Sequence, residues 1–252
     1  MVTAKPPLWV WVLLVAAIFG VSSAGTLLQQ IDLDPLLKAS WRLQLTAVVL
    51  LPFAIVQWRQ QSSEVKAQMF EKRTLAILAL SGLALALHFG AWVASLKYTT
   101  LTHSLLFVTA HPLIVVAGMF ILGILLTGVR QPTQRELVGA MIGFAGAALT
   151  LLDEGTQQGD NTVTLLGDSL ALLGAFTVVG YIVCGRILRA WMPIFLYAFP
   201  VTLLAAVLLL PASMLIENDF ATYGVVGWLD ATFFGWFLAL ALIAGLVGHT
   251  GL

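Results

Sequence analysis

Eight runs of apolar residues, each long enough to cross a lipid bilayer, take up most of this 252-residue chain. A membrane helix needs roughly 20 apolar residues, and only helices and closed barrels satisfy their backbone hydrogen bonds in hydrocarbon. The runs lie at Leu8–Leu28, Leu36–Trp58, Thr74–Leu96, Leu101–Thr127, Glu136–Leu152, Leu165–Arg186, Pro193–Ile216 and Ala231–Leu252. None shows the alternation of a barrel strand. We therefore predict an all-α integral membrane protein with eight transmembrane helices.

Composition supports the bilayer as the main partner and excludes several functions. Hydrophobic residues make up 60% of the chain and charged residues 10%, whereas a soluble domain carries about 25% charged residues. Twelve Lys and Arg residues balance twelve Asp and Glu residues, so the basic surface that nucleic acids require is missing. Cys184 is the one cysteine, and no Cys/His cluster has metal-ligand spacing. We expect no nucleic acid, metal or cofactor.

The distribution of charge predicts the orientation of the chain in the membrane. With the N-terminus in the cytoplasm, nine of the twelve Lys and Arg residues fall inside: Lys5, Arg59, Lys66, Lys72, Arg73, Arg130, Arg135, Arg186 and Arg189. The opposite loops carry Asp32, Asp34, Asp153, Glu154, Asp160, Glu217, Asp219 and Asp230, with Asp168 at a helix mouth. Lys and Arg accumulate in cytoplasmic loops. We predict a cytoplasmic N-terminus in a plasma membrane, which the short loops suggest is a bacterial inner membrane.

The first run also has the features of a secretory signal peptide. Lys5 precedes it, and Ser22-Ser23-Ala24 has the form of a cleavage site. Cleavage would remove one helix and leave the other seven unchanged. We retain the run as the first transmembrane helix.

An internal repeat relates the two ends of the chain. Gly20 and Gly25 recur as Gly180 and Gly185, an offset of 160 residues, and Val48–Pro52 and His88–Gly90 recur as Val207–Pro211 and His249–Gly251. The offset covers five helices, an odd number, so the second copy would have inverted topology, as in many secondary transporters. We predict a first five-helix repeat at 1–152 and a second at 153–252 that holds three helices, which makes the chain a C-terminally incomplete part of a ten-helix protein.

Several segments, taken together in their order, carry a resemblance to a known family. They are Asp34-Pro35 with Ser40-Trp41-Arg42, Leu87–Tyr98, Ala110–Leu113, Gly139–Gly146 and Gly167-Asp168. The chain resembles the EamA-like branch of the drug/metabolite transporter superfamily, whose ten helices form two inverted five-helix repeats. The resemblance implies transport of amino acids, nucleotide sugars, other metabolites or drugs. Where the family commonly has a Gly-Glu pair, this chain has Gly128-Val129-Arg130, so that acid is absent or Glu136 takes its role.

Arg42 is the first candidate for substrate binding because it lies well inside the second predicted helix. Ionisable groups in hydrocarbon normally face the bundle interior or a wet cavity. A guanidinium there can bind a carboxylate or phosphate through two parallel hydrogen bonds. The alternative is that its long side chain snorkels to the outer headgroups.

Polar residues on the third predicted helix share one face. Ser81, His88, Trp92 and Ser95 are separated by seven, four and three residues. This stripe predicts either a cavity wall, with His88 as ligand or proton carrier, or hydrogen bonds to neighbouring helices at about 0.6 kcal/mol each. Trp92 would also suit the aromatic belt at the membrane interface.

The fourth predicted helix places Ser104, His111 and Gly118 at intervals of seven residues. Pro112 removes a helix hydrogen bond beside His111, as in the broken helices of transporter sites. His103 lies nearer the outer mouth, where we expect it to be solvated. The predicted substrate-binding residues are Arg42, His88, Trp92, His111, Tyr181 and His249, the last as the repeat partner of His88.

The glycines of the fifth predicted helix, Gly139, Gly143 and Gly146, favour close packing within the bundle or in a homodimer. For function, these features predict a secondary carrier that moves a small polar metabolite by alternating access. A channel or a substrate-sensing receptor remains the alternative. Gly20-Val21-Ser22 resembles the site of an intramembrane serine protease but lacks the second glycine, so we do not expect an enzyme.

Overall fold

A computed structural model describes residues 7–125, 130–149 and 162–249, and within these ranges all regular structure is helical. The chain divides into two compact units. The first comprises Met1–Ala86 and Cys184–Leu252, and the second comprises Leu87–Val183. Both boundaries fall inside long helices.

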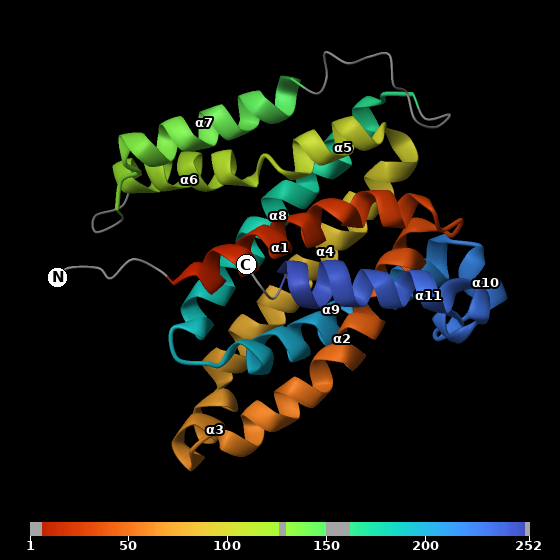
Figure 1. Cartoon of the computed structure of the whole chain (residues 1–252), viewed down its shortest axis with the longest axis horizontal. Helices are drawn as coiled ribbons and strands as arrows, with labels where there is room; N and C mark the ends of the chain where they lie inside the picture. Colours follow the sequence, from red (N-terminus) through yellow and green to blue (C-terminus); the bar gives the residue numbers. More distant parts are fainter. Residues whose placement is uncertain (1–6, 126–129, 150–161, 250–252) are drawn as a thin grey trace. The chain divides into compact units, whose positions relative to one another are not determined.

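The helices of the described residues account for the apolar runs of the sequence. In chain order they are α1 (Leu8–Gln29), α2 (Pro35–Gln60), α3 (Ser63–Met69), α4 (Lys72–Tyr98), α5 (Leu101–Val108), α6 (His111–Leu125), α7 (Gln134–Ala148), α8 (Leu165–Arg189), α9 (Ile194–Ile216), α10 (Asp219–Tyr223), η2 (Gly227–Leu229), α11 (Ala231–Ala239) and η3 (Leu240–His249). Figure 1 shows this order along the chain. Among the described residues, seven helical segments are long and apolar enough to cross a membrane. The prediction of an all-α membrane protein is confirmed.

The described helices match most predicted runs and differ at three. Five runs form the single helices α1, α2, α4, α8 and α9, whereas the fourth divides into α5 and α6. The fifth run appears as α7, which has 15 described residues and is not among the seven candidate spans. The rest of that run, from Thr150, lies outside the described residues, so the count of eight spans stays a prediction. The last run continues from α11 into η3, a π-helix of 10 residues.

Local chemistry explains where several helices begin. Pro35 occupies the first turn of α2, where its fixed φ angle suits the helix and its missing N–H leaves no partner unsatisfied. The Thr100 side chain accepts a hydrogen bond from the His103 backbone N–H at the start of α5. Asp230 caps α11 in the same way, and the hydrogen bond from the Thr232 N–H lowers the pKa of its carboxyl. These short-range contacts set the boundaries between helices.

The centre of the first unit is the pair formed by α2 and α9, which lie side by side (Figure 1). Ser40 donates a hydrogen bond of 2.9 Å to the carbonyl of Ala206 across this interface. Near the other end of the pair, the rings of Phe53 and Phe195 stack with centroids 5.0 Å apart. The start of one helix therefore lies beside the end of the other.

Close glycine contacts hold α1 and α2 against η3. A Cβ atom added at Gly20 of α1 would come within 2.5 Å of the Ile243 carbonyl oxygen, and one at Gly245 within 2.7 Å of Thr46 on α2. A membrane interface gains little from hydrophobic burial, so small residues that let helices approach closely provide much of the packing energy. At Gly20 the close atom is backbone, so only glycine fits without a shift of η3, whereas a methyl group at Gly245 would displace the Thr46 side chain.

In the second unit, α6 and α7 lie side by side (Figure 1). The predicted glycine face of α7 does not pack within the described part of the chain. A Cβ atom added at Gly139, Gly143 or Gly146 would meet nothing within 4 Å. The first predicted role of these glycines, packing inside the bundle, is therefore not seen among the described residues. A dimer contact stays a prediction.

Candidate functional site

Arg42 lies in the first unit and is buried, with 1% of its surface exposed. All three guanidinium nitrogens are inaccessible to solvent. Its backbone carbonyl accepts a hydrogen bond from Thr46, one turn further along α2. A side chain enclosed in this way does not extend toward the outer headgroups. The structure therefore does not support snorkelling, the alternative reading of Arg42.

An aromatic cluster covers α2 beside Arg42. Trp41 is fully buried and packs against three rings, those of Tyr223, Phe233 and Phe237, with centroid distances of 6.3, 5.7 and 5.6 Å. The edge-to-face and tilted geometries are those that aromatic pairs prefer. The cluster brings α11 and the segment that precedes it onto α2. It accounts for the burial of this part of the helix.

His88 and Trp92 come together in the second unit. Their rings stack at 15° with centroids 6.2 Å apart, and both side chains are buried. The His88 Nδ1 atom lies 2.9 Å from the carbonyl oxygen of Gly174 on α8. A carbonyl can only accept, so Nδ1 carries the hydrogen, and Nε2 is the nitrogen that can take a second proton. Burial of Trp92 inside the protein argues against a place in the interface belt.

The other polar residues on the stripe of α4 bond to side chains of neighbouring helices. Ser81 lies 2.6 Å from the Tyr197 hydroxyl of α9. The Ser95 and Ser104 hydroxyl oxygens are 2.7 Å apart, which joins α4 to α5. These contacts agree with the second role predicted for the stripe, hydrogen bonding between helices. His88 and Trp92 remain its candidates for a cavity wall.

Pro112 breaks the fourth predicted helix, as the sequence suggested. A residue with an N–H at position 112 would donate to the carbonyl of Val108, four residues earlier, but proline has none. In the structure the His111 side chain replaces that donor, with Nδ1 3.3 Å from the Val108 oxygen. The break separates α5 from α6, so the seven-residue spacing of Ser104 and His111 does not run along one continuous helix. His111 is half-buried.

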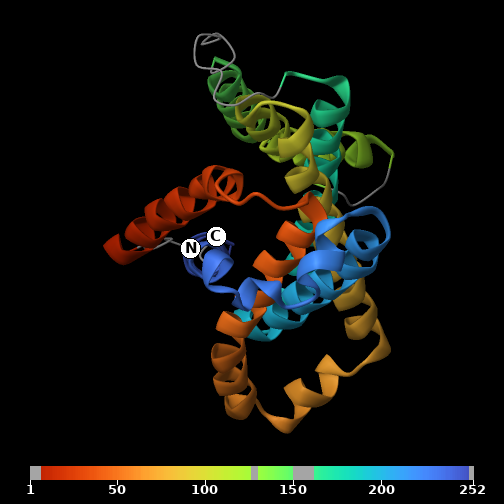
Figure 2. The same cartoon turned by 90° about the vertical axis from the view of Figure 1, so that its right-hand side faces the viewer.

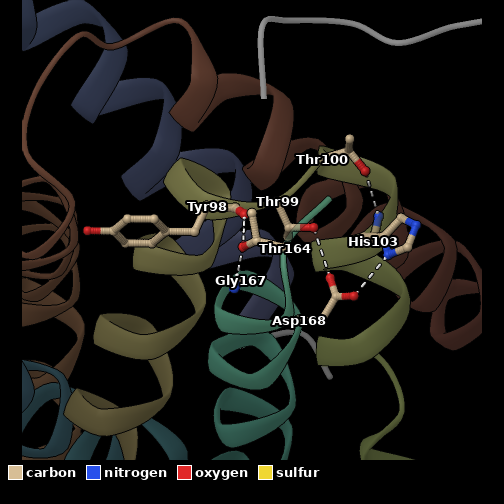
Figure 3. A network of polar contacts seen from close by, with 7 residues as sticks. All are labelled: Tyr98, Thr99, Thr100, His103, Thr164, Gly167 and Asp168. Atoms are coloured by element: carbon tan, nitrogen blue, oxygen red, sulfur yellow. Dashed lines mark hydrogen bonds and ion pairs between the residues drawn. The ribbon is translucent and has the colours of Figure 1, made fainter. Parts of the chain in front are cut away.

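His103 differs from its prediction, because it takes part in a polar network that joins three helices (Figure 3). Its Nδ1 donates toward Oδ2 of Asp168 on α8 at 3.2 Å, and the Thr99 hydroxyl donates to Oδ1 at 2.8 Å. The His103 and Asp168 side chains are 25% and 17% exposed. Thr164 extends the network, donating to the Tyr98 carbonyl and accepting from the Gly167 N–H. His103 is therefore a structural link at the ends of these helices and is not simply solvated.

No local pattern in the sequence predicts this network. His103 and Asp168 are 65 positions apart, and Thr99 and Asp168 are 69 apart. The sequence placed both titratable residues near one membrane face. Their pairing depends on how α5 and α8 pack, which periodicity along a single helix does not describe.

The six predicted substrate-binding residues divide between the two units. Arg42 and His249 belong to the first, and His88, Trp92, His111 and Tyr181 belong to the second. Tyr181 is half-buried on α8, and the His249 side chain lies outside what the structure describes. A common cavity for Arg42, His88 and His111 stays a prediction. Among the described residues, no group of three or more His, Cys, Asp or Glu side chains could hold a metal ion.

These features define a class of protein. Seven apolar helical segments among the described residues, with buried polar side chains that bond between helices, make this a multi-pass membrane protein. The model of the EamA-like transporter family matches residues 7–152. The chain belongs to the EamA-like transporter family, which confirms the resemblance to the drug/metabolite transporters; members of this family are transporters, not enzymes. No match was found among curated proteins or among solved structures.

Proposed function

We propose that this chain is a secondary transporter that moves a small polar metabolite across the plasma membrane by alternating access, with its N-terminus in the cytoplasm. The observation that carries this proposal is a pair of repeat-related contacts between α2 and α9. Gln57 of α2 accepts a hydrogen bond from the backbone N–H of Phe195 in α9. Glu217, directly after α9, accepts one from the backbone N–H of Leu36 in α2. Gln57 and Glu217 are 160 residues apart, and Leu36 and Phe195 are 159 apart. Alternating access in many carriers uses two halves related in this way.

Two glycine contacts recur at nearly the same offset. A Cβ atom at Gly245 would meet Thr46 of α2, and one at Gly82 of α4 would come within 2.7 Å of Leu204 of α9. The offsets are 163 residues for the glycines and 158 for their partners. In each case the third helix of one predicted repeat lies against the second helix of the other. These contacts support two copies of one helical unit, which we assign to residues 1–152 and 153–252.

Arg42, His88 and His111 are the residues we expect to meet the polar part of the substrate, with Trp92, Tyr181 and His249 around them. Arg42 would bind an anionic group through its planar fork. His88 would accept a hydrogen bond or a coupling proton at Nε2, because Nδ1 is held by Gly174. The Val108 carbonyl fixes His111 at the helix break, where the backbone is irregular.

Uptake by cells that express the gene tests the proposal, with a panel of labelled amino acids and nucleotide sugars. We expect saturable uptake of at least one compound. Arg42→Lys should raise the KM because a two-point contact becomes a point charge, and His88→Ala and His111→Ala should lower the rate. Thr222→Ala is the control, since Thr222 is exposed and is not among the predicted substrate-binding residues. If His88 carries a coupling proton, its loss should also flatten the pH dependence of uptake between about 5 and 8.

Two outcomes would contradict this function, and a third would contradict the assigned site. Flux that rises linearly with concentration would indicate a channel, and binding without flux would indicate a receptor. Parental uptake in all three site variants would show that these residues only hold helices together.

A further inference from the structure

The segment that joins α2 to α4 gathers positive charge around a short helix. This α3 connector, residues 58–73, contains Arg59, Lys66, Lys72 and Arg73 against Glu64 and Glu71, a net charge of +2. Arg59, Lys72 and Arg73 are exposed. In Figure 2 the orange helix α3 lies across the ends of α2 and α4 in the first unit. The cations therefore lie at the end of a membrane span.

Two aromatic rings lie among these cations. Phe70 is 67% exposed, and its ring packs edge-to-face on that of Trp58 with centroids 6.0 Å apart. The Lys66 ammonium lies 5.5 Å from the centroid of the Trp58 ring, within reach of a cation–π attraction. Aromatic rings flanked by Lys and Arg are typical of the level where acyl chains meet headgroups.

A second connector follows α9 as the α3 connector follows α2, and its charge is negative. Residues 217–230 contain Glu217, Asp219 and Asp230 and no Lys or Arg. This segment is docked on the protein: Asp219 accepts a hydrogen bond from the Asp34 N–H, and Tyr223 packs on Trp41. Of the aromatic rings in this acidic connector, Trp228 is buried and Tyr223 is 42% exposed. In the α3 connector, Phe70 is 67% exposed and lies beside cations.

We propose that the α3 connector is a binding surface for anionic phospholipid headgroups. Arg59, Lys72 and Arg73 contact headgroup phosphates, and Phe70 lies where the acyl chains meet the headgroups. Charge complementarity selects the partner, because basic residues next to a membrane helix are attracted to anionic lipid. The exposed ring selects a lipid over a free phosphate ion, since it needs an apolar neighbour. This surface is independent of transport.

Fluorescence quenching by brominated lipids tests the proposal on the full chain in phosphatidylcholine liposomes. The contribution of Trp58 is the difference between the parent and Trp58→Phe, which keeps a ring against Phe70. We expect brominated phosphatidylglycerol to quench it about fivefold more effectively than brominated phosphatidylcholine at equal mole fraction. Phe70→Ser should weaken quenching by both lipids and leave their ratio unchanged.

A matched pair of double variants separates this surface from general attraction. Lys72→Gln with Arg73→Gln should bring the ratio of the two lipids close to one. Arg186→Gln with Arg189→Gln removes two exposed cations from the last turn of α8 and should leave the ratio near the parental value. Equal quenching by the two lipids in the parent would overturn the proposal. An equal fall of the quenching ratio in both double variants would overturn it as well. All four positions are exposed, and unchanged thermal unfolding would show that each variant is folded.

Discussion

Oε1 of Gln57, near the end of α2, accepts a hydrogen bond of 2.9 Å from the backbone N–H of Phe195 at the start of α9. Glu217, directly after α9, accepts hydrogen bonds of 2.6 and 2.9 Å from the N–H groups of Leu36 and Leu37 at the start of α2. Each helix thus supplies acceptors for the first turn of the other, where N–H groups lack partners within their own helix. The two contacts fix the register of the pair at both ends.

Glu217→Ala should destabilise the protein because it removes the acceptor for two N–H groups of α2. We expect a loss of about 1–2 kcal/mol, the usual cost of losing a helix cap. Thermal unfolding of the protein in detergent measures this effect. Asn218→Ala changes the next, exposed side chain and should leave the unfolding temperature at its parental value. An equal fall of the unfolding temperature in both variants would show that the Glu217 carboxylate is not the group that stabilises α2.

Gly20→Ala should loosen the contact between α1 and η3. The added methyl group would come within 2.5 Å of the Ile243 carbonyl oxygen, and backbone there cannot move aside without shifting a helix. Overpacking of this kind costs about 1–3 kcal/mol. Gly139→Ala is the matched control in open space on α7. A lower unfolding temperature for Gly139→Ala than for Gly20→Ala would contradict the packing described for α1.

The hydroxyl groups of Ser81 and Tyr197 should show a coupling energy in a double-mutant cycle. Both side chains are buried and their oxygens are 2.6 Å apart. The cycle of Ser81→Ala and Tyr197→Phe should give about 0.6 kcal/mol, with about 1.7 kcal/mol as the upper end for membrane helices. Unfolding of the two single variants and the double variant provides the measurement. Strict additivity would mean that the bond contributes nothing to stability.

Cysteine accessibility tests the predicted orientation in a Cys184→Ala background, which removes the one buried thiol. Thr222 and Ser63 are both exposed and lie in segments predicted on opposite sides of the membrane. On intact cells, an impermeant maleimide should label Thr222→Cys and spare Ser63→Cys until the cells are opened. The reverse pattern would invert the topology.

Much of the helical framework follows from residues close together in the chain. The apolar runs predict α1, α2, α4, α8 and α9 because a bilayer requires every backbone group to bond within its own segment. Pro112 likewise predicts the division between α5 and α6, since a missing N–H is a local property. The change from α11 to the π-helix η3 has no counterpart in the periodicity of the sequence. There, Gly245 packs against Thr46 on α2.

The sequence by itself determined that this protein lies in a lipid bilayer, that it is helical, and which ionisable residues lie within its apolar runs. Tertiary structure decided which of those residues meet. Ser81 pairs with Tyr197 across 116 positions, His88 with Gly174 across 86 and Ser95 with Ser104 across nine, so three of the four polar residues on the α4 stripe bond to other helices. His103, expected in solvent, instead faces Asp168. Periodicity shows which side of a helix is polar, whereas the identity of the partner depends on how separate helices pack.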